Sequence, residues 1–90
     1  MRADKQKVGR LLKIARGQID GILKMIEDDA YCMDISNQLM ATASILRKAN
    51  REVLRAHLEG CVKDAFAGGS EEEKDRKIAE ILGAMDSLSR

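Results

Sequence analysis

The chain has no proline, no tryptophan, and only one phenylalanine and one tyrosine among its 90 residues. Strands favour aromatic and β-branched side chains, so this shortage argues against a sheet protein. The chain is rich instead in alanine, leucine, methionine, lysine, glutamate and arginine, which have good helix propensity. The composition therefore predicts an all-α protein.

Other absences narrow the class further. Apolar residues make up 44% and the net charge is only +1, which argues against disorder. No run of apolar residues is long enough to span a bilayer, and the first ten residues, MRADKQKVGR, do not form a signal peptide. We expect one cytoplasmic helical domain over residues 1–90. A core so poor in aromatic side chains is thin, so we also expect an oligomer.

Apolar residues recur at helical spacing in three segments. The first runs from about residue 4 to 28 and the second from about 31 to 66. A second helix of that length is typical of long helices that pair with one another. Between the two segments, Asp28 or Asp29 is a candidate to cap the second helix.

The sequence Gly68-Gly69-Ser70 is the clearest break in the chain. Ser70 followed by Glu73 is typical of a capping box, which predicts that a third helix begins there. The apolar stripe of this helix consists of Ile78, Ile81, Leu82, Met85 and Leu88.

Charge is unevenly distributed along the chain. Residues 1–16 hold six basic side chains and one acidic one, whereas residues 64–90 hold four basic and seven acidic ones. The basic end of the first helix, together with Arg47, Lys48, Arg51 and Arg55, indicates a surface for a polyanion. An ordinary solvated surface would show the same pattern, and the pI of about 7.8 is lower than that of most nucleic-acid-binding domains.

Two cysteines and one histidine are the candidate metal ligands. His57 and Cys61 are four residues apart, which places them on one face of a helix. Cys32 lies 25 residues before His57, or ~37 Å along a continuous helix. Two antiparallel copies of that helix would bring Cys32 of one subunit to His57 and Cys61 of the other, which predicts two equivalent sites in a two-fold dimer.

Two thiolates and one imidazole form a soft donor set that favours Cu(I) or Zn(II). Zinc usually takes four ligands, and the chain has no fourth cysteine or histidine, which favours Cu(I). The alternative is that both cysteines are small buried apolar residues and the histidine is incidental. Catalysis by a Cys–His pair is the least favoured interpretation, because the sequence shows no motif for an oxyanion-binding loop.

Two stretches of the sequence resemble the copper-sensing repressor family, which also includes nickel/cobalt, formaldehyde and persulfide sensors. They are RGQIDGILKMIEDDAYC at 16–32 and ANREVLRAHLEGC at 49–61. The spacing Cys-x24-His-x3-Cys is specific to the family, and the resemblance covers nearly the whole chain. It implies a three-helix protomer, an antiparallel four-helix-bundle dimer and a homotetramer assembled as a dimer of dimers.

The resemblance also implies a function. The metal-free repressor would bind operator DNA through basic surface residues, without a helix-turn-helix. Cu(I) held by Cys32 of one subunit and by His57 and Cys61 of its partner would release the DNA. Tyr31 matches the family's tyrosine just before the first cysteine, and Glu80 matches a third-helix glutamate that contacts the ligand histidine.

The ligands favour the copper branch of the family. Nickel/cobalt sensors need an additional N-terminal histidine, which residues 1–16 lack. Formaldehyde sensors lack a cysteine at position 61, and persulfide sensors usually lack the histidine. A persulfide-responsive repressor that uses Cys32 and Cys61 stays open as an alternative, as do a cytosolic copper-buffering protein and a plain helical oligomerisation module.

For DNA, the resemblance points to basic residues of the first two helices. Arg16, Lys48 and Arg51 stand where the family has basic residues. The family often has arginine at the position of Leu11, and here Arg10 is its neighbour. The candidate DNA-binding residues are therefore Arg10, Lys13, Arg16, Lys48 and Arg51.

Overall fold

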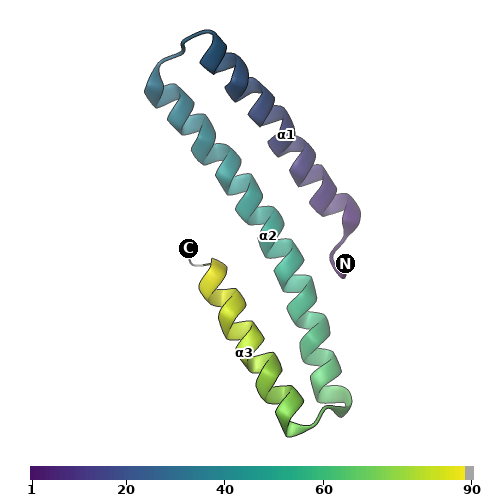
Figure 1. The fold of residues 1–90 in the computed structure, drawn as a ribbon. Helices are drawn as coiled ribbons and strands as arrows, with labels where there is room; N and C mark the ends of the chain where they lie inside the picture. The colour runs from purple at the N-terminus through teal and green to yellow at the C-terminus, as the bar shows by residue number, and fades with distance from the viewer. Residues whose placement is uncertain (89–90) are drawn as a thin grey trace. The chain divides into compact units, whose positions relative to one another are not determined.

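The computed structural model describes residues 1–88, and of residues 65, 66 and 88 the backbone alone. Three α-helices and no strand occur in this range: α1 (Lys5–Glu27), α2 (Cys32–Gly68) and α3 (Glu71–Leu88) (Figure 1). The all-α, three-helix prediction is confirmed. None of the described helices is both long and apolar enough to cross a bilayer.

The chain forms two compact units. The first, here the α1 unit, consists of Asp4–Asn50, and the second, the α3 unit, consists of Met1–Ala3 and Arg51–Arg90. Each unit is an antiparallel helix pair (Figure 1): α1 lies beside the first part of α2, and α3 lies beside its last part. The three candidate soft ligands are divided between the units: Cys32 belongs to the α1 unit, and His57 and Cys61 belong to the α3 unit.

The two ends of α1 depend on aspartates. Asp4 caps the beginning, and its carboxylate accepts hydrogen bonds from the backbone amides of Gln6 and Lys7 at 2.9 and 3.3 Å. At the other end Asp28 is the C-cap of α1, and Asp29 adopts the left-handed conformation with φ 51°. Aspartate tolerates this conformation better than most residues, so it suits a position where the chain must leave a helix.

The expectation that Asp28 or Asp29 caps the second helix is therefore wrong. Helix α2 begins only at Cys32, and the backbone carbonyl of Tyr31 accepts from the amides of Asp34 and Ile35. Both aspartates are used in ending α1 instead.

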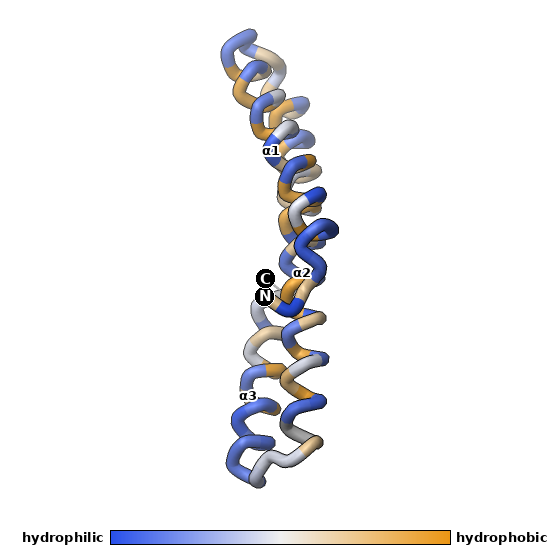
Figure 2. Tube along the Cα trace, turned by 90° about the vertical axis from the view of Figure 1, so that its right-hand side faces the viewer, coloured by the Kyte–Doolittle hydropathy of each residue, from blue (hydrophilic) through white to orange (hydrophobic). Residues whose placement is uncertain are grey.

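The core of the α1 unit is narrow. The buried residues of α1 are Val8, Leu11, Ala15 and Ile22. Figure 2 shows apolar and polar positions interspersed along the helices. In the part of α2 that belongs to this unit, the buried residues are Ala49 and the polar Thr42. The Thr42 hydroxyl lies 2.8 Å from Gln18 Oε1 and 3.1 Å from the backbone carbonyl of Gln38, so its polarity is satisfied and it links α2 to α1.

The α3 unit is held by caps and ion pairs as well as by apolar contacts. Ser70 Oγ accepts a hydrogen bond from the amide of Glu73 at 3.3 Å, which confirms the predicted serine cap. The N-terminal residues join this unit through Arg2, whose guanidinium lies over Gly60 and pairs with Asp64 at 2.7 Å. The prediction that Leu88 belongs to the apolar stripe falls on a side chain outside the described part.

Many large apolar side chains remain exposed. No large side chain among those described is completely shielded from solvent. Side chains with about half their surface exposed occur on all three helices, among them Leu12, Ile19, Leu23 and Ile26 of α1, Leu39, Met40 and Leu46 of α2, and Ile78, Leu82 and Met85 of α3. A single chain thus leaves much apolar surface uncovered.

Candidate metal centre

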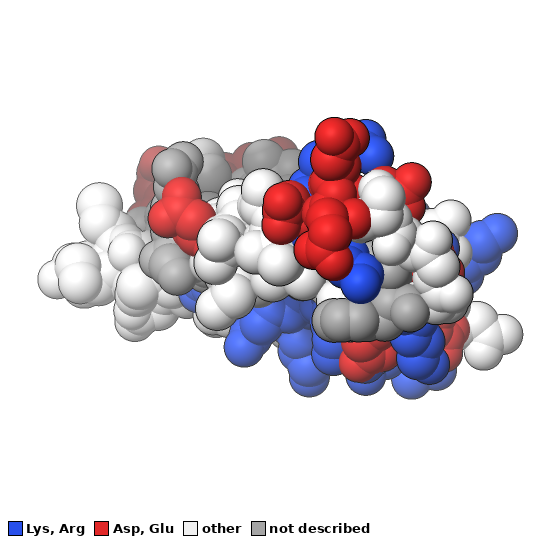
Figure 3. Space-filling view, turned by 90° about the horizontal axis from the view of Figure 1, so that it is seen from below, with Lys and Arg blue, Asp and Glu red and all other residues white. Residues whose placement is uncertain are grey.

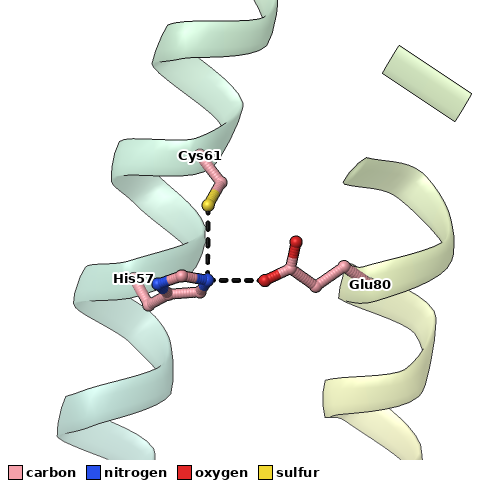
Figure 4. A group of neighbouring side chains, drawn as sticks. All are labelled: His57, Cys61 and Glu80. Carbon is pink, nitrogen blue, oxygen red and sulfur yellow. Dashed lines mark hydrogen bonds and ion pairs between the residues drawn. The ribbon is translucent and has the colours of Figure 1, made fainter. Parts of the chain in front are cut away.

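His57 and Cys61 lie one turn apart on the same face of α2, as their spacing predicts. Cys61 Sγ is 3.3 Å from His57 Nε2 (Figure 4). Cys61 is buried, with only 5% of its surface exposed, whereas His57 is exposed. The pair therefore combines one buried side chain and one exposed side chain.

Glu80 approaches the same imidazole from α3 (Figure 4). Its Oε1 lies 2.5 Å from His57 Nε2. The hydrogen bond from the imidazole is the main cause that lowers the pKa of Glu80, so this carboxyl is ionised near neutral pH. An Nε2–H that donates to Glu80 leaves Nδ1 as the unprotonated nitrogen of the ring. The contact between Glu80 and His57 expected from the resemblance is present.

Lys77 adds a positive charge to this group. Its Nζ lies 3.6 Å from Cys61 Sγ and 3.5 Å from Glu80 Oε2. The electrostatic interaction with Cys61, followed by that with Glu80, raises the pKa of Lys77. Lys77 was not predicted from the sequence. Its i,i+3 spacing to Glu80 was visible, but its approach to Cys61 depends on how α3 packs against α2.

The donor set of this group fits a soft metal ion. Ligand atoms of His57, Cys61 and Glu80 all lie within 4.8 Å of one another. A thiolate and an imidazole are donors that copper and zinc share, whereas magnesium and calcium prefer oxygen alone. The group alone supplies one thiolate, so a soft three-ligand set needs a further sulfur.

The remaining cysteine belongs to the α1 unit. Cys32 is exposed at the start of α2, and Tyr31 before it is 69% exposed. Neither is part of the group formed by His57, Cys61 and Glu80 among the described residues. Its exposure at the start of α2 leaves the Cys32 thiol accessible as a ligand.

The candidate DNA-binding residues are exposed. Arg10, Lys13 and Arg16 follow one another along α1, Lys48 lies on α2 in the same unit, and Arg51 is the first α2 residue of the other unit. Among the described residues, no ion pair is recorded for any of these five. Leu11, where the family often has arginine, is 8% exposed, so Arg10 is the residue here that presents a charge to solvent.

Arg55 and the acidic start of α3 are less suited to contact a polyanion. Arg55 bonds Glu52 at 3.1 Å and Glu59 at 3.0 Å on its own helix, which makes it less available to a polyanion than the five candidates. The first turn of α3 carries Glu71, Glu72 and Glu73, and Figure 3 shows acidic side chains gathered on the face seen from below. Acidic groups at a helix N-terminus stabilise that helix, and they repel nucleic acid.

The fold and the thiol–imidazole pair together indicate an all-α protein with a candidate metal centre. Comparison with known proteins identifies its family. Residues 4–87 match the family described as metal-sensitive transcriptional repressor. The chain belongs to this family, whose class is regulatory rather than enzymatic.

Curated relatives carry more specific names. The chain is 52% identical over 74 residues to the copper-sensing transcriptional repressor CsoR of Mycobacterium ulcerans, over 82% of this chain and 61% of that protein. It is 44% identical over 83 residues to CsoR of Mycobacterium tuberculosis H37Rv, over 92% of this chain and 67% of the relative. With CsoR of Bacillus subtilis it shares 31% identity over 87 residues. The matched part of the chain spans 61% and 67% of the length of these two mycobacterial CsoR proteins.

A solved structure has the same fold. The nickel-responsive transcriptional regulator InrS superposes with a TM-score of 0.80 over 98% of this chain and 96% of its own, at 26% sequence identity. The three-helix arrangement of this chain is therefore also that of a regulator named for its response to nickel.

Proposed function

We propose that this chain is a copper-responsive transcriptional repressor, which binds operator DNA without metal and leaves it when Cu(I) binds. The observation that carries the proposal is the pair His57 and Cys61, 3.3 Å apart on one face of α2, with Glu80 bonded to the imidazole from α3. Membership of a metal-sensitive repressor family and relatives named as copper-sensing support it.

In this proposal each metal site is shared between two subunits. Cys32 of one subunit and His57 and Cys61 of the partner subunit would hold Cu(I), which as a soft cation joins two thiolates and an imidazole. Two observations support sharing: α2 is continuous from Cys32 through Cys61, and Cys32 is exposed in a unit that does not contain the other two ligands.

The same arrangement requires an oligomer. Exposed apolar side chains on all three helices are the surface that an antiparallel dimer, and then a dimer of dimers, would cover. The homotetramer is therefore part of the proposal.

DNA binding is assigned to the exposed cations on α1 and α2, namely Arg10, Lys13, Arg16, Lys48 and Arg51. Without a helix inserted into the major groove, phosphate contacts would dominate the affinity, and it would fall steeply with salt. Sequence preference would then depend largely on DNA shape.

Glu80 is the residue that would transmit the state of His57 to α3. While Nε2 donates to Glu80, the imidazole has a fixed orientation and tautomer, and α3 is tied to α2. A ligand at the imidazole changes the strength of this bond, and through it the position of α3.

The test is a titration of the reduced protein with Cu(I) while binding to its own promoter DNA is followed. We expect one Cu(I) per subunit and loss of DNA binding over the same range. If Cu(I) leaves the complex intact and polysulfide dissolves it, the alternative of a persulfide-responsive repressor that uses Cys32 and Cys61 is correct. Copper binding without any DNA binding at low salt would instead identify a copper-buffering protein.

A further inference from the structure

A fixed positive charge lies directly against the candidate metal ligands. Lys77 Nζ contacts Cys61 Sγ at 3.6 Å and Glu80 Oε2 at 3.5 Å, and its side chain is 38% exposed. Both contacts are made by the same ammonium group. No part of the function proposed above uses it.

This charge acts differently on metal ions of different charge. A metal bonded to Cys61 Sγ at about 2.3 Å would lie within about 6 Å of the ammonium while Lys77 keeps its place. Coulomb repulsion is proportional to the charge of the incoming ion, so a divalent ion is repelled twice as strongly as a monovalent one. Both ions displace the same thiol protons, and this cost cancels when their affinities are compared.

The contact with Glu80 acts in the same direction. Zn(II) accepts carboxylate oxygen as a ligand, whereas Cu(I) prefers sulfur. Lys77 bonds Oε2 of Glu80, and His57 bonds Oε1, so both oxygens of this carboxylate are engaged. A zinc ion that took Glu80 as its fourth ligand would therefore have to compete with His57 and Lys77 for the carboxylate oxygens.

We propose that Lys77 is a specificity-determining residue of the metal centre, which favours monovalent Cu(I) over divalent Zn(II). This inference rests on the proposed function, because it assumes that Cys61 is a metal ligand. It predicts that removal of the Lys77 charge lowers the ratio of the Cu(I) affinity to the Zn(II) affinity.

The experiment compares the affinities of this 90-residue chain for Cu(I) and for Zn(II), each measured anaerobically against a competing chelator. In Lys77→Gln the preference for Cu(I) over Zn(II) should fall by roughly fivefold, for one charge removed at about 6 Å from a partly exposed site. Lys77→Arg keeps the charge and should keep the preference. Lys74→Gln is the matched control, since Lys74 lies one turn earlier on α3 and pairs with Glu71.

The outcomes separate this inference from the proposed function. A ratio that stays within twofold in Lys77→Gln, or that falls equally in Lys74→Gln, would overturn the role of Lys77 while copper binding stands. A wild-type protein in which Cys61 binds neither metal would overturn the proposed function and this inference together. Circular dichroism of each variant shows whether the helices are retained, and Lys77→Arg tests the charge in a side chain of similar length.

Discussion

The α1 unit and the α3 unit differ in how several of their basic side chains are engaged. In the α3 unit, Arg55 is paired with Glu52 and Glu59, and Lys77 is paired with Glu80. In the α1 unit, Arg10, Lys13 and Arg16 are exposed, and no ion pair is recorded for them in the described part of the chain. Paired charges position neighbouring groups, whereas exposed cations remain available to phosphate.

This difference suggests a division of tasks between the units. The α3 unit holds the imidazole, a buried thiol and the two charged groups that contact them. The α1 unit supplies most of the candidate DNA contacts and the exposed Cys32. If the division is correct, variants of Cys61 and Glu80 in the α3 unit should change metal binding, and variants of the exposed cations on α1 should change DNA binding. The following predictions test that separation.

The largest effect is expected from loss of the buried thiol. Cys61→Ser should weaken Cu(I) binding by more than about a hundredfold, since replacing an outer-shell partner alone costs 10–100-fold. Metal-free binding to DNA should stay within about twofold. Chelator competition and fluorescence anisotropy measure the two quantities. Equal loss of both would mean that Cys61 is needed for the fold and not only for the metal.

Removal of the carboxylate that contacts the imidazole comes next. Glu80→Ala should weaken Cu(I) binding by roughly tenfold or more, because the imidazole loses the acceptor that fixes its tautomer. The Cu(I) that does bind should also release DNA less completely. Glu72→Ala, an exposed change in the first turn of α3, is the control for the loss of one carboxylate. Unchanged Cu(I) affinity and full release in Glu80→Ala would contradict the proposed coupling.

A smaller effect is expected from the basic surface of α1. The double change Arg10→Gln and Lys13→Gln should weaken metal-free DNA binding by about tenfold near physiological salt and reduce its salt dependence. Cu(I) affinity should not change. Arg55→Gln provides a comparison, because Arg55 is already paired on its own helix and its loss should affect DNA binding less. Equal effects of the two variants would show that pairing does not distinguish the DNA-binding cations.

The smallest effect concerns stability alone. Thr42→Val removes a buried hydroxyl that lies 2.8 Å from Gln18 Oε1 and should lower the free energy of unfolding by about 1 kcal/mol. Metal affinity should be unaffected, since Thr42 lies in the α1 unit. Urea denaturation followed by circular dichroism measures the change. Greater stability in the variant would mean that the apolar methyl contributes more than the hydrogen bond.

Much of the fold could be predicted because its signals are local. Helical spacing of apolar residues and the Ser70 cap placed the three helices within a few residues of their observed ends. The prediction failed at Asp28 and Asp29, where the same residue type suits either a helix start or a left-handed position. Only the backbone conformation shows whether such an aspartate begins a helix or ends one.

The site was predictable in part. The pair His57 and Cys61 follows from spacing on one helix, and Glu80 came from resemblance to a family. Lys77 was missed, because its contact with Cys61 joins two helices across a break in the chain. Thr42 was missed as well, since a threonine inside a helix carries no signal that it will be buried and bonded to the neighbouring helix. Cytoplasmic location, the tetramer and the participation of Cys32 stay predictions.

The most direct test of the shared site mixes two defective subunits. Cys32→Ser and Cys61→Ser proteins are unfolded together, refolded at equal concentrations, and assayed for high-affinity Cu(I) sites. If each site takes Cys32 from one subunit and Cys61 from the partner subunit, each mixed dimer regains one intact site, and random pairing gives about one site per four chains. Each variant refolded alone should have none. If the mixture also has none although subunits exchange, each site lies within one subunit, and the account of a shared copper centre is wrong.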